Sequence, residues 1–416
     1  MIPLTLGQAG WLLGGQLVNA GSPAEGLLTN VRMVNSVFED AGPQAVQYLP
    51  ADFDPNVNTS QFVDQIPSYA AHGVNAFTLS MQGGMPGYEG AVNSAFNADG
   101  SLRGGYIDRV GRGIRAAGRS GCGVILSCLY QRQHSHARSL QTQKAIHAAV
   151  ANTAAWIAAQ GFTHVVLEIA NEFAHAGYAN WPDGQWLQTP EGQVELIATA
   201  RAAAPGLLVS TSGMGSGRAA AQIAAAVDFL IIHFNNTANA DIPARIAAAK
   251  EYGKAVVCNE DDKTCATGAE AARLSIAHGS GWGFMHKEQN QSAPFVFAGS
   301  QDDPVVYAML KRLTTPGEVS SRVVDEAIFA LITQPRDGDR FAADTVVDIV
   351  VDVAGIESDY SVALEVGDLT IGRLDRVPWT FRWTAAPLGG HDLVAIVYNA
   401  SGVEVARSRP VDIVVG

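Results

Sequence analysis

The most constraining feature of this chain is a regular alternation of extended and helical segments between residues 28 and 313. Apolar runs of strand length are expected at 28–35, 74–80, 123–130, 163–172, 207–211, 228–234, 254–260 and 282–286. Helical segments, many of them rich in Ala, are expected at 59–71, 106–117, 143–159, 192–203, 219–226, 242–252, 268–278 and 304–313. Neighbouring strands are about 30 residues apart, which is the length of one βα unit. The pattern predicts an α/β fold of the (β/α)8 TIM-barrel type. A doubly wound sheet is disfavoured because no Gly-rich phosphate loop follows the first strand.

The two ends of the chain do not follow this alternation. Residues before 28 are expected to be irregular. The composition changes at Thr314-Thr-Pro-Gly317, and short alternating runs are expected at 328–332, 345–353, 361–366, 379–383, 393–398, 403–407 and 411–415. Turn signals such as Asp337-Gly338 separate these runs, a pattern typical of a small all-β immunoglobulin-like sandwich. We therefore expect a barrel at 1–316 and a sandwich at 327–416.

The overall charge excludes some classes of partner. The chain has 40 acidic and 27 basic residues and a net charge of −13, so it offers no basic surface for nucleic acid. No apolar run is long and continuous enough to span a membrane. A neutral substrate such as a glycan fits this balance. The first residues lack the basic and apolar regions of a signal peptide, but a secreted or periplasmic location stays open if Met1 is not the natural first residue.

The chain has four cysteines, and none forms a CxxC pair, so zinc-ribbon chemistry is disfavoured. Cys122 and Cys128 bracket one expected strand and are too far apart along it for a disulfide with each other. We expect them to be buried thiols. A bridge between Cys258 and Cys265 is left open.

Two glutamates at strand ends are the strongest candidates for catalysis. In the fourth expected strand Val165, Leu167 and Ile169 fall on one face, so Glu168 and Glu172 fall on the other. Glu172 ends that strand, and Glu260 ends the seventh. In a (β/α)8 barrel the ends of these two strands face each other across the mouth. Paired carboxyl groups are what glycoside hydrolysis needs, because one protonates the leaving oxygen and the other attacks or activates water.

At this point the sequence resembles a known superfamily. Leu167-Glu-Ile-Ala-Asn-Glu172 looks like the strand-4 motif of the clan A retaining glycoside hydrolases, and Val256-Val-Cys-Asn-Glu260 looks like their strand-7 motif. The resemblance implies that Glu172 is the general acid/base and Glu260 the nucleophile, that Asn171 binds the sugar 2-hydroxyl, and that His233 touches substrate or nucleophile. It also implies a structural role for Glu168, as in the cellulase-like members. Phe173 stands where the clan often has Pro, and His286 follows the eighth strand where many members have a Trp.

The remaining candidates are weaker, and two readings are open for several of them. Glu168 is expected to be a buried partner of Arg32. The further candidates for substrate contacts are His134, His136, Trp181, Trp186, His286 and Tyr130. The two tryptophans either stack on sugar rings or pack within their loop, and the His134–His136 pair is either a substrate or metal contact or part of a polar loop.

The leading reading is therefore a hydrolase of oligo- or polysaccharides that needs no cofactor and no metal. Two alternatives stay open, a metal-dependent barrel hydrolase using His134, His136 and His233, and a non-catalytic carbohydrate-binding barrel. The segment Val377-Pro-Trp-Thr-Phe-Arg-Trp383 with the strand after it resembles the bacterial Ig-like modules appended to polysaccharide-active enzymes. The oligomeric state cannot be predicted.

Overall fold

The computed structural model describes residues 2–40, 49–84, 92–134, 136–317, 328–354, 360–367, 369–408 and 410–416. It divides into two compact units. The first comprises Met1–Lys263, Ala271–Asp303 and Leu310–Arg322, and the second comprises Thr264–Glu270, Pro304–Met309 and Val323–Gly416. The predicted junction between residues 316 and 327 falls largely in 318–327, outside the described residues.

Parallel strands form the centre of the first unit. Six of them pair in one parallel sheet in the order β11-β4-β5-β6-β7-β8, and β9 and β10 form a second parallel pair. Their bounds are β4 (Thr29–Arg32), β5 (Ala76–Ser80), β6 (Gly123–Leu129), β7 (Val165–Ala170), β8 (Val209–Ser210), β9 (Leu230–His233), β10 (Val256–Glu260) and β11 (Trp282–Phe284). Isolated parallel bridges join Ser212 to Ile231, Val257 to Gly281 and Asp261 to Phe284. All eight strands lie within the predicted segments, and each is shorter than predicted.

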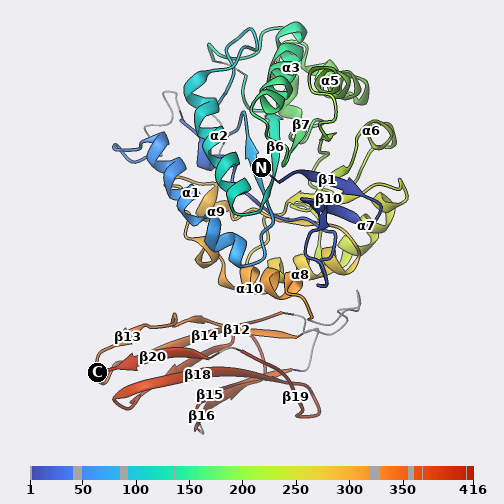
Figure 1. Ribbon diagram of the computed structural model, residues 1–416. Helices are drawn as coiled ribbons and strands as arrows, with labels where there is room; N and C mark the ends of the chain where they lie inside the picture. The colour runs from blue at the N-terminus through green and yellow to red at the C-terminus, as the bar shows by residue number, and fades with distance from the viewer. Residues whose placement is uncertain are drawn as a thin grey trace. The chain divides into compact units, whose positions relative to one another are not determined.

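Helices surround these strands, and α1, α2, α3, α5 and α7 lie around β6, β7 and β10 in Figure 1. The α-helices are α1 (Pro55–Ala71), α2 (Gly104–Arg119), α3 (Gln143–Ala159), α4 (Gly184–Leu187), α5 (Pro190–Ala203), α6 (Ala221–Ala226), α7 (Ile242–Lys250), α8 (Cys265–Ala277), α9 (Lys287–Asn290) and α10 (Pro304–Thr314). Capping residues set several starts: the side chains of Asp54, Thr142 and Thr189 accept hydrogen bonds from the first turns of α1, α3 and α5. Short 3-10 turns lie at η1 (Val34–Val37), η3 (Ala176–Asn180), η4 (Asn239–Asp241) and η5 (Gly299–Gln301). None of the described helices has both the length and the apolar composition required to cross a membrane.

The N-terminal residues are ordered, so the expectation of an irregular segment was wrong. The antiparallel strands β1 (Leu4–Gly7), β2 (Gly10–Leu13) and β3 (Gln16–Leu17) form a small sheet. Strands this short show no clear period of two, which is why the sequence pattern missed them. Leu4 and Trp11 are buried in one apolar cluster with side chains near the amino ends of the parallel strands, namely Ala76, Ile125, Val166, Phe229, Ile231 and Val257.

The C-terminal part of the second unit is all β. Its strands are β12 (Phe329–Gln334), β13 (Arg340–Phe341), β14 (Val347–Ala354), β15 (Ser361–Val366), β16 (Leu369–Leu374), β17 (Thr380–Trp383), β18 (Gly389–Tyr398), β19 (Glu404–Arg407) and β20 (Val411–Val415). One sheet has the order β12-β14-β17, and the other the order β13-β20-β18-β15-β16, with β19 paired to β18. Side chains from both sheets share one apolar core, which includes Ile349, Leu364, Phe381 and Ala395. The sequence pattern missed β13, which has two residues, and β16, whose side chains are largely outside the core.

The cysteines give a simple test of this packing. Cys122, Cys128 and Cys258 are buried, whereas Cys265 is exposed. Cys258 is a free thiol, so the bridge to Cys265 is not formed. Burial raises the pKa of the Cys122 and Cys128 thiols to about 12, which suppresses the reactive thiolate. We expect a thiol reagent to modify Cys265 alone in the folded protein and all four cysteines after denaturation, as counted by absorbance or mass. Rapid modification of a second thiol under native conditions would contradict the packing.

Candidate active site

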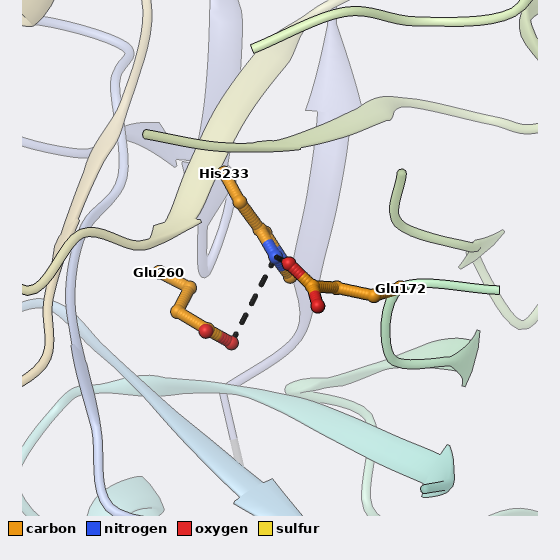
Figure 2. A group of neighbouring side chains, drawn as sticks. All are labelled: Glu172, His233 and Glu260. Carbon is orange, nitrogen blue, oxygen red and sulfur yellow. Dashed lines mark hydrogen bonds and ion pairs between the residues drawn. The ribbon is translucent and has the colours of Figure 1, made fainter. Parts of the chain in front are cut away.

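Three side chains meet at the carboxyl ends of the parallel strands. Glu172 follows β7, His233 ends β9 and Glu260 ends β10. Figure 2 shows the three side chains pointing toward one another. One ligand atom from each, a ring nitrogen or a carboxylate oxygen, lies within 4.8 Å of the corresponding atoms of the other two. The two predicted catalytic glutamates are thus neighbours, although they come from distant parts of the chain.

Glu260 is held by one ion pair and one hydrogen bond. The guanidinium Nε of Arg32 lies 3.1 Å from Oε2 of Glu260, and the amide Nδ2 of Asn235 donates to its Oε1 at 2.7 Å. Burial alone would raise the pKa of Glu260, but the charges of Arg32 and His233 and the bond from Asn235 outweigh it and lower that pKa. The Glu260 carboxylate is therefore ionised near neutral pH and keeps a fixed orientation.

Glu172 has an unusual backbone. Its φ is +49°, in the left-handed region that a non-glycine residue enters at a cost of about 1–2 kcal/mol. The N–H of Glu172 donates to Oγ of Ser212 at 2.9 Å, and its carbonyl accepts from the N–H of His175 at 2.7 Å. The side chain is 13% exposed and reaches His233, whose Nδ1 lies 3.2 Å from Oε1 of Glu172. Glu172 is thus accessible from solvent and tied at both of its backbone groups.

His233 connects the two carboxyl groups. It is fully buried, and its Nδ1 lies 3.2 Å from Glu172 Oε1 and 3.8 Å from Glu260 Oε2. Burial alone would lower the pKa of this imidazole, but the charge of Glu260 and then the hydrogen bond and charge of Glu172 outweigh it and raise the pKa. His233 Nδ1 thus lies between the two carboxyl groups.

Asn171 is fixed beside this group. Its Oδ1 accepts from Arg32 Nη2 at 3.0 Å, and its Nδ2 donates to Gln131 Oε1 at 3.4 Å. Tyr178 donates its hydroxyl hydrogen to the carbonyl of Leu129 or Asn171, with oxygen–oxygen distances of 3.0 and 3.2 Å. One guanidinium, that of Arg32, therefore contacts the polar residues of both strand-end motifs. The contact of Asn171 with a sugar hydroxyl stays a prediction.

The predicted pairing of Arg32 with Glu168 was wrong. Both side chains are buried, but Arg32 contacts Glu260 and Asn171 instead. Glu168 accepts a long hydrogen bond of 3.4 Å from Asn259 Nδ2. Glu168 is fully buried within β7, four residues before Glu172, whereas Arg32 contacts residues that end a strand or follow one.

Trp181 and Trp186 pack into their own loop region. Trp181 is 4% exposed, and its Nε1 donates to the carbonyl of Gln131 at 3.1 Å, so of the two readings open for this residue the structure favours packing over sugar stacking. Trp186 is half-buried and lies against His147, with ring centroids 5.3 Å apart. A sugar contact by Trp186 stays a prediction.

The other predicted contacts are distributed around the same end of the strands. Tyr130 follows β6 and is half-buried. His286 begins α9, where its Nδ1 accepts from the N–H of Gln289 at 3.2 Å. His136 is built into its loop: Nε2 lies 3.1 Å from Gln133 Oε1, and Nδ1 accepts from the N–H of Arg138. Substrate contacts by these residues, and by His134, stay predictions.

We expect the stability of the protein to fall between pH 6.5 and pH 4, and part of that fall to disappear in His136→Asn. Burial, followed by the charges of Arg138, His134 and Arg103, lowers the pKa of His136 from 6.5 to about 4. In this window the unfolded chain binds a proton at residue 136 that the folded chain does not, so a falling pH favours unfolding. Urea unfolding midpoints at about pH 7.5 and about pH 4.5 measure the difference. The same loss of stability in both proteins would contradict the expectation.

Three contributing residues were not assigned to the site from the sequence. Asn235 and Ser212 were not singled out, and Arg32 was assigned to a different partner. Asn235 is two residues after His233 and projects to the same side, so the period of two offered a signal for it. Ser212 follows the very short strand β8 and offered none. Within the described residues, the group of His, Cys, Asp and Glu side chains close enough to hold a metal ion consists of Glu172, His233 and Glu260, and does not include His134 or His136.

Comparison with known proteins identifies the fold alone. The sequence matches no protein-family model and no curated protein. The β-glucuronidase of Bacteroides uniformis superposes with a TM-score of 0.52 at 8% identity over 100% of this chain and 48% of that enzyme. The endo-β-1,4-mannanase of Thermotoga petrophila (TM-score 0.49, 14% identity, 94% of this chain and 97% of that one) and a tri-modular endo-β-1,4-glucanase of Bacillus licheniformis (0.49, 13%, 95% and 79%) are also similar. The chain spans about half the length of the β-glucuronidase. The likeness to that enzyme agrees with a mixed α/β protein that has a parallel sheet, followed by an all-β region.

Proposed function

We propose that the protein is a glycoside hydrolase whose eight parallel strands close into a (β/α)8 barrel at residues 1–316. The bridges between residues 212 and 231, 257 and 281, and 261 and 284 support closure, because they link β8 to β9 and β10 to β11. Every strand then has two neighbours, and no sheet edge is left open. In such a barrel the carboxyl ends of the strands carry the chemistry, and these are the ends where Glu172, His233 and Glu260 meet.

The proposed reaction is hydrolysis of an O-glycosidic bond in an oligo- or polysaccharide by double displacement. Glu260 attacks the anomeric carbon while Glu172 donates its proton to the departing oxygen, so that a glycosyl ester forms on Glu260. Glu172, now ionised, takes a proton from water, and that water attacks the anomeric carbon and releases Glu260. The two inversions give net retention.

The close approach of the two carboxyl groups carries this proposal. One oxygen of Glu172 and one of Glu260 lie within 4.8 Å of each other. Retaining enzymes hold their carboxyl groups about 5–5.5 Å apart, whereas inverting enzymes need about 6.5–9.5 Å to admit a water molecule. Arg32 and Asn235 support the nucleophilic role of Glu260, because they stabilise the ionised carboxylate that attacks.

The alternative of a metal-dependent hydrolase is less well supported. The three-residue group could supply ligands, but Arg32 already places a positive charge 3.1 Å from Glu260 Oε2, where a metal ion would have to bind. The alternative of a non-catalytic binding barrel does not account for a left-handed Glu172 held beside a second carboxylate.

We assign no catalytic step to the C-terminal region at 327–416, which we propose to be an Ig-like module. Its two sheets enclose an apolar core dominated by Val, Ile, Leu, Phe and Trp side chains. Among the described residues of this region no Asp or Glu side chain is buried, so the buried carboxyl pair of the first unit has no counterpart among them.

Product stereochemistry tests the function and the mechanism together. The intact protein is screened on aryl glycosides and polysaccharides, and the anomeric proton of fresh product from an active substrate is followed by NMR. We expect the first product to have the anomeric configuration of the substrate. Release of the opposite anomer would refute double displacement, and hydrolysis that is lost on chelation would favour the metal-dependent alternative.

A further inference from the structure

We infer that Ser212 is a positioning residue for the general acid/base, and that it acts by holding the backbone of Glu172 in its left-handed conformation. This inference rests on the proposed function of Glu172. Ser212 lies just after β8, is fully buried and contacts Glu172 through the backbone N–H of that residue. Its effect on catalysis would therefore pass through the main chain.

The hydrogen bonds of Ser212 connect the ends of β7 and β8. Its Oγ accepts from the N–H of Glu172 at 2.9 Å and donates to the carbonyl of Ala170 at 3.3 Å. Its own carbonyl accepts from the N–H of Phe173 at 3.0 Å, and its N–H donates to Ala170 O at 3.3 Å. Ala170 and Phe173, on either side of Glu172, are thus both bonded by Ser212, which follows the neighbouring strand.

These hydrogen bonds matter because the backbone conformation of Glu172 is unfavourable in itself. A φ of +49° is uncommon for a residue with a long side chain and persists only where the surroundings enforce it. The direction of the side chain depends on this backbone angle. If the chain at 172 relaxed to negative φ, the carboxyl group would swing away from His233, whose Nδ1 now lies 3.2 Å from it. Removal of the Ser212 hydroxyl takes away the acceptor of the Glu172 N–H and permits that relaxation.

The test is a double-mutant cycle in the intact chain, with kcat/KM, which reports the first displacement, measured on aryl glycosides of graded leaving-group ability. We expect Ser212→Ala to lower kcat/KM about 10- to 100-fold for poor leaving groups, the scale of a misplaced catalytic group, and much less for activated ones. In a Glu172→Gln background the same change should have no further effect, because Ser212 acts through Glu172. A loss of stability without a positioning role would instead lower kcat/KM equally in both backgrounds and for all leaving groups.

Two further variants keep the result interpretable. Thr211→Val is the matched control, since Thr211 is buried next to Ser212 and also bonds Ala170 O, but its hydroxyl contacts Gln193 and not Glu172. We expect it to keep the leaving-group dependence of the wild type. If Ser212→Ala does not fold, Ser212→Cys keeps the size and weakens the acceptor, and we expect an intermediate loss. Equal leaving-group dependence in wild type and Ser212 variants would overturn the inference alone, whereas folded wild type that hydrolyses no glycoside would overturn the proposed function and the inference with it.

Discussion

Glu260→Gln is expected to abolish turnover of every glycoside, by on the order of 10⁵-fold, the scale seen when an activated nucleophile is removed. The reason is that the proposed glycosyl ester forms on Glu260, so leaving-group quality cannot compensate for its loss. Initial rates on an activated aryl glycoside and on a natural glycan measure the loss. Asp262→Asn is the matched control, because it removes a carboxylate two residues further along the chain and outside the group of Glu172, His233 and Glu260.

Chemical rescue separates loss of the nucleophile from loss of folding. In Glu260→Ala a small anion such as azide can enter the space left by the side chain and attack the anomeric carbon. We expect the rescued product to be a glycosyl azide of inverted configuration, because one displacement replaces two. Rescue with retained configuration would assign the nucleophile to another residue.

Glu172→Gln is expected to lower kcat by about 10²- to 10⁴-fold for substrates with poor leaving groups, the usual contribution of a general acid or base. Activated aryl leaving groups need little protonation, so the first step should remain fast for them and the glycosyl-enzyme should accumulate. A burst of released phenol followed by slow turnover, together with a mass increase at Glu260, would be the direct evidence.

The same rescue experiment at residue 172 is expected to give a product of the opposite configuration. In Glu172→Ala, azide should intercept the glycosyl-enzyme without the help of a base and give a product of retained configuration. Two results would remove the distinction between the two roles. One is a glycosyl azide of inverted configuration from both alanine variants, and the other is a small and equal loss of activity in both glutamine variants.

The alternation of strands and helices was predictable because each unit is encoded locally. Buried parallel strands are short apolar runs, and the helices between them have capping residues such as Thr142. The positions of Glu172 and Glu260 followed from the same pattern, since each directly follows or ends such a run. Their proximity needed one further assumption, that the strands are arranged in sequence around a common centre.

The environment of the two glutamates could not be predicted in the same way. Arg32 reaches Glu260 and not Glu168 because side-chain direction and depth decide the contact, and neither is visible in a sequence pattern. Ser212 accepts a hydrogen bond from the backbone N–H of Glu172. Every residue except proline has such an N–H, so no sequence pattern marks this contact. For Trp181 the sequence left sugar stacking and packing open, and only the structure shows that the ring is buried with its Nε1 bonded.

The small N-terminal sheet bears on how this protein can be re-engineered. Leu4 and Trp11 pack near the amino ends of the parallel strands, and the ring of Trp11 lies 5.0 Å from that of Phe229. Glu172, His233 and Glu260 lie at the carboxyl ends, where loops leave the strands. A library that diversifies the loops at the carboxyl ends can therefore alter the surroundings of these three side chains while the opposite end preserves the melting temperature. A library at the N-terminal sheet would yield heat-resistant or heat-sensitive clones and leave those surroundings unaltered.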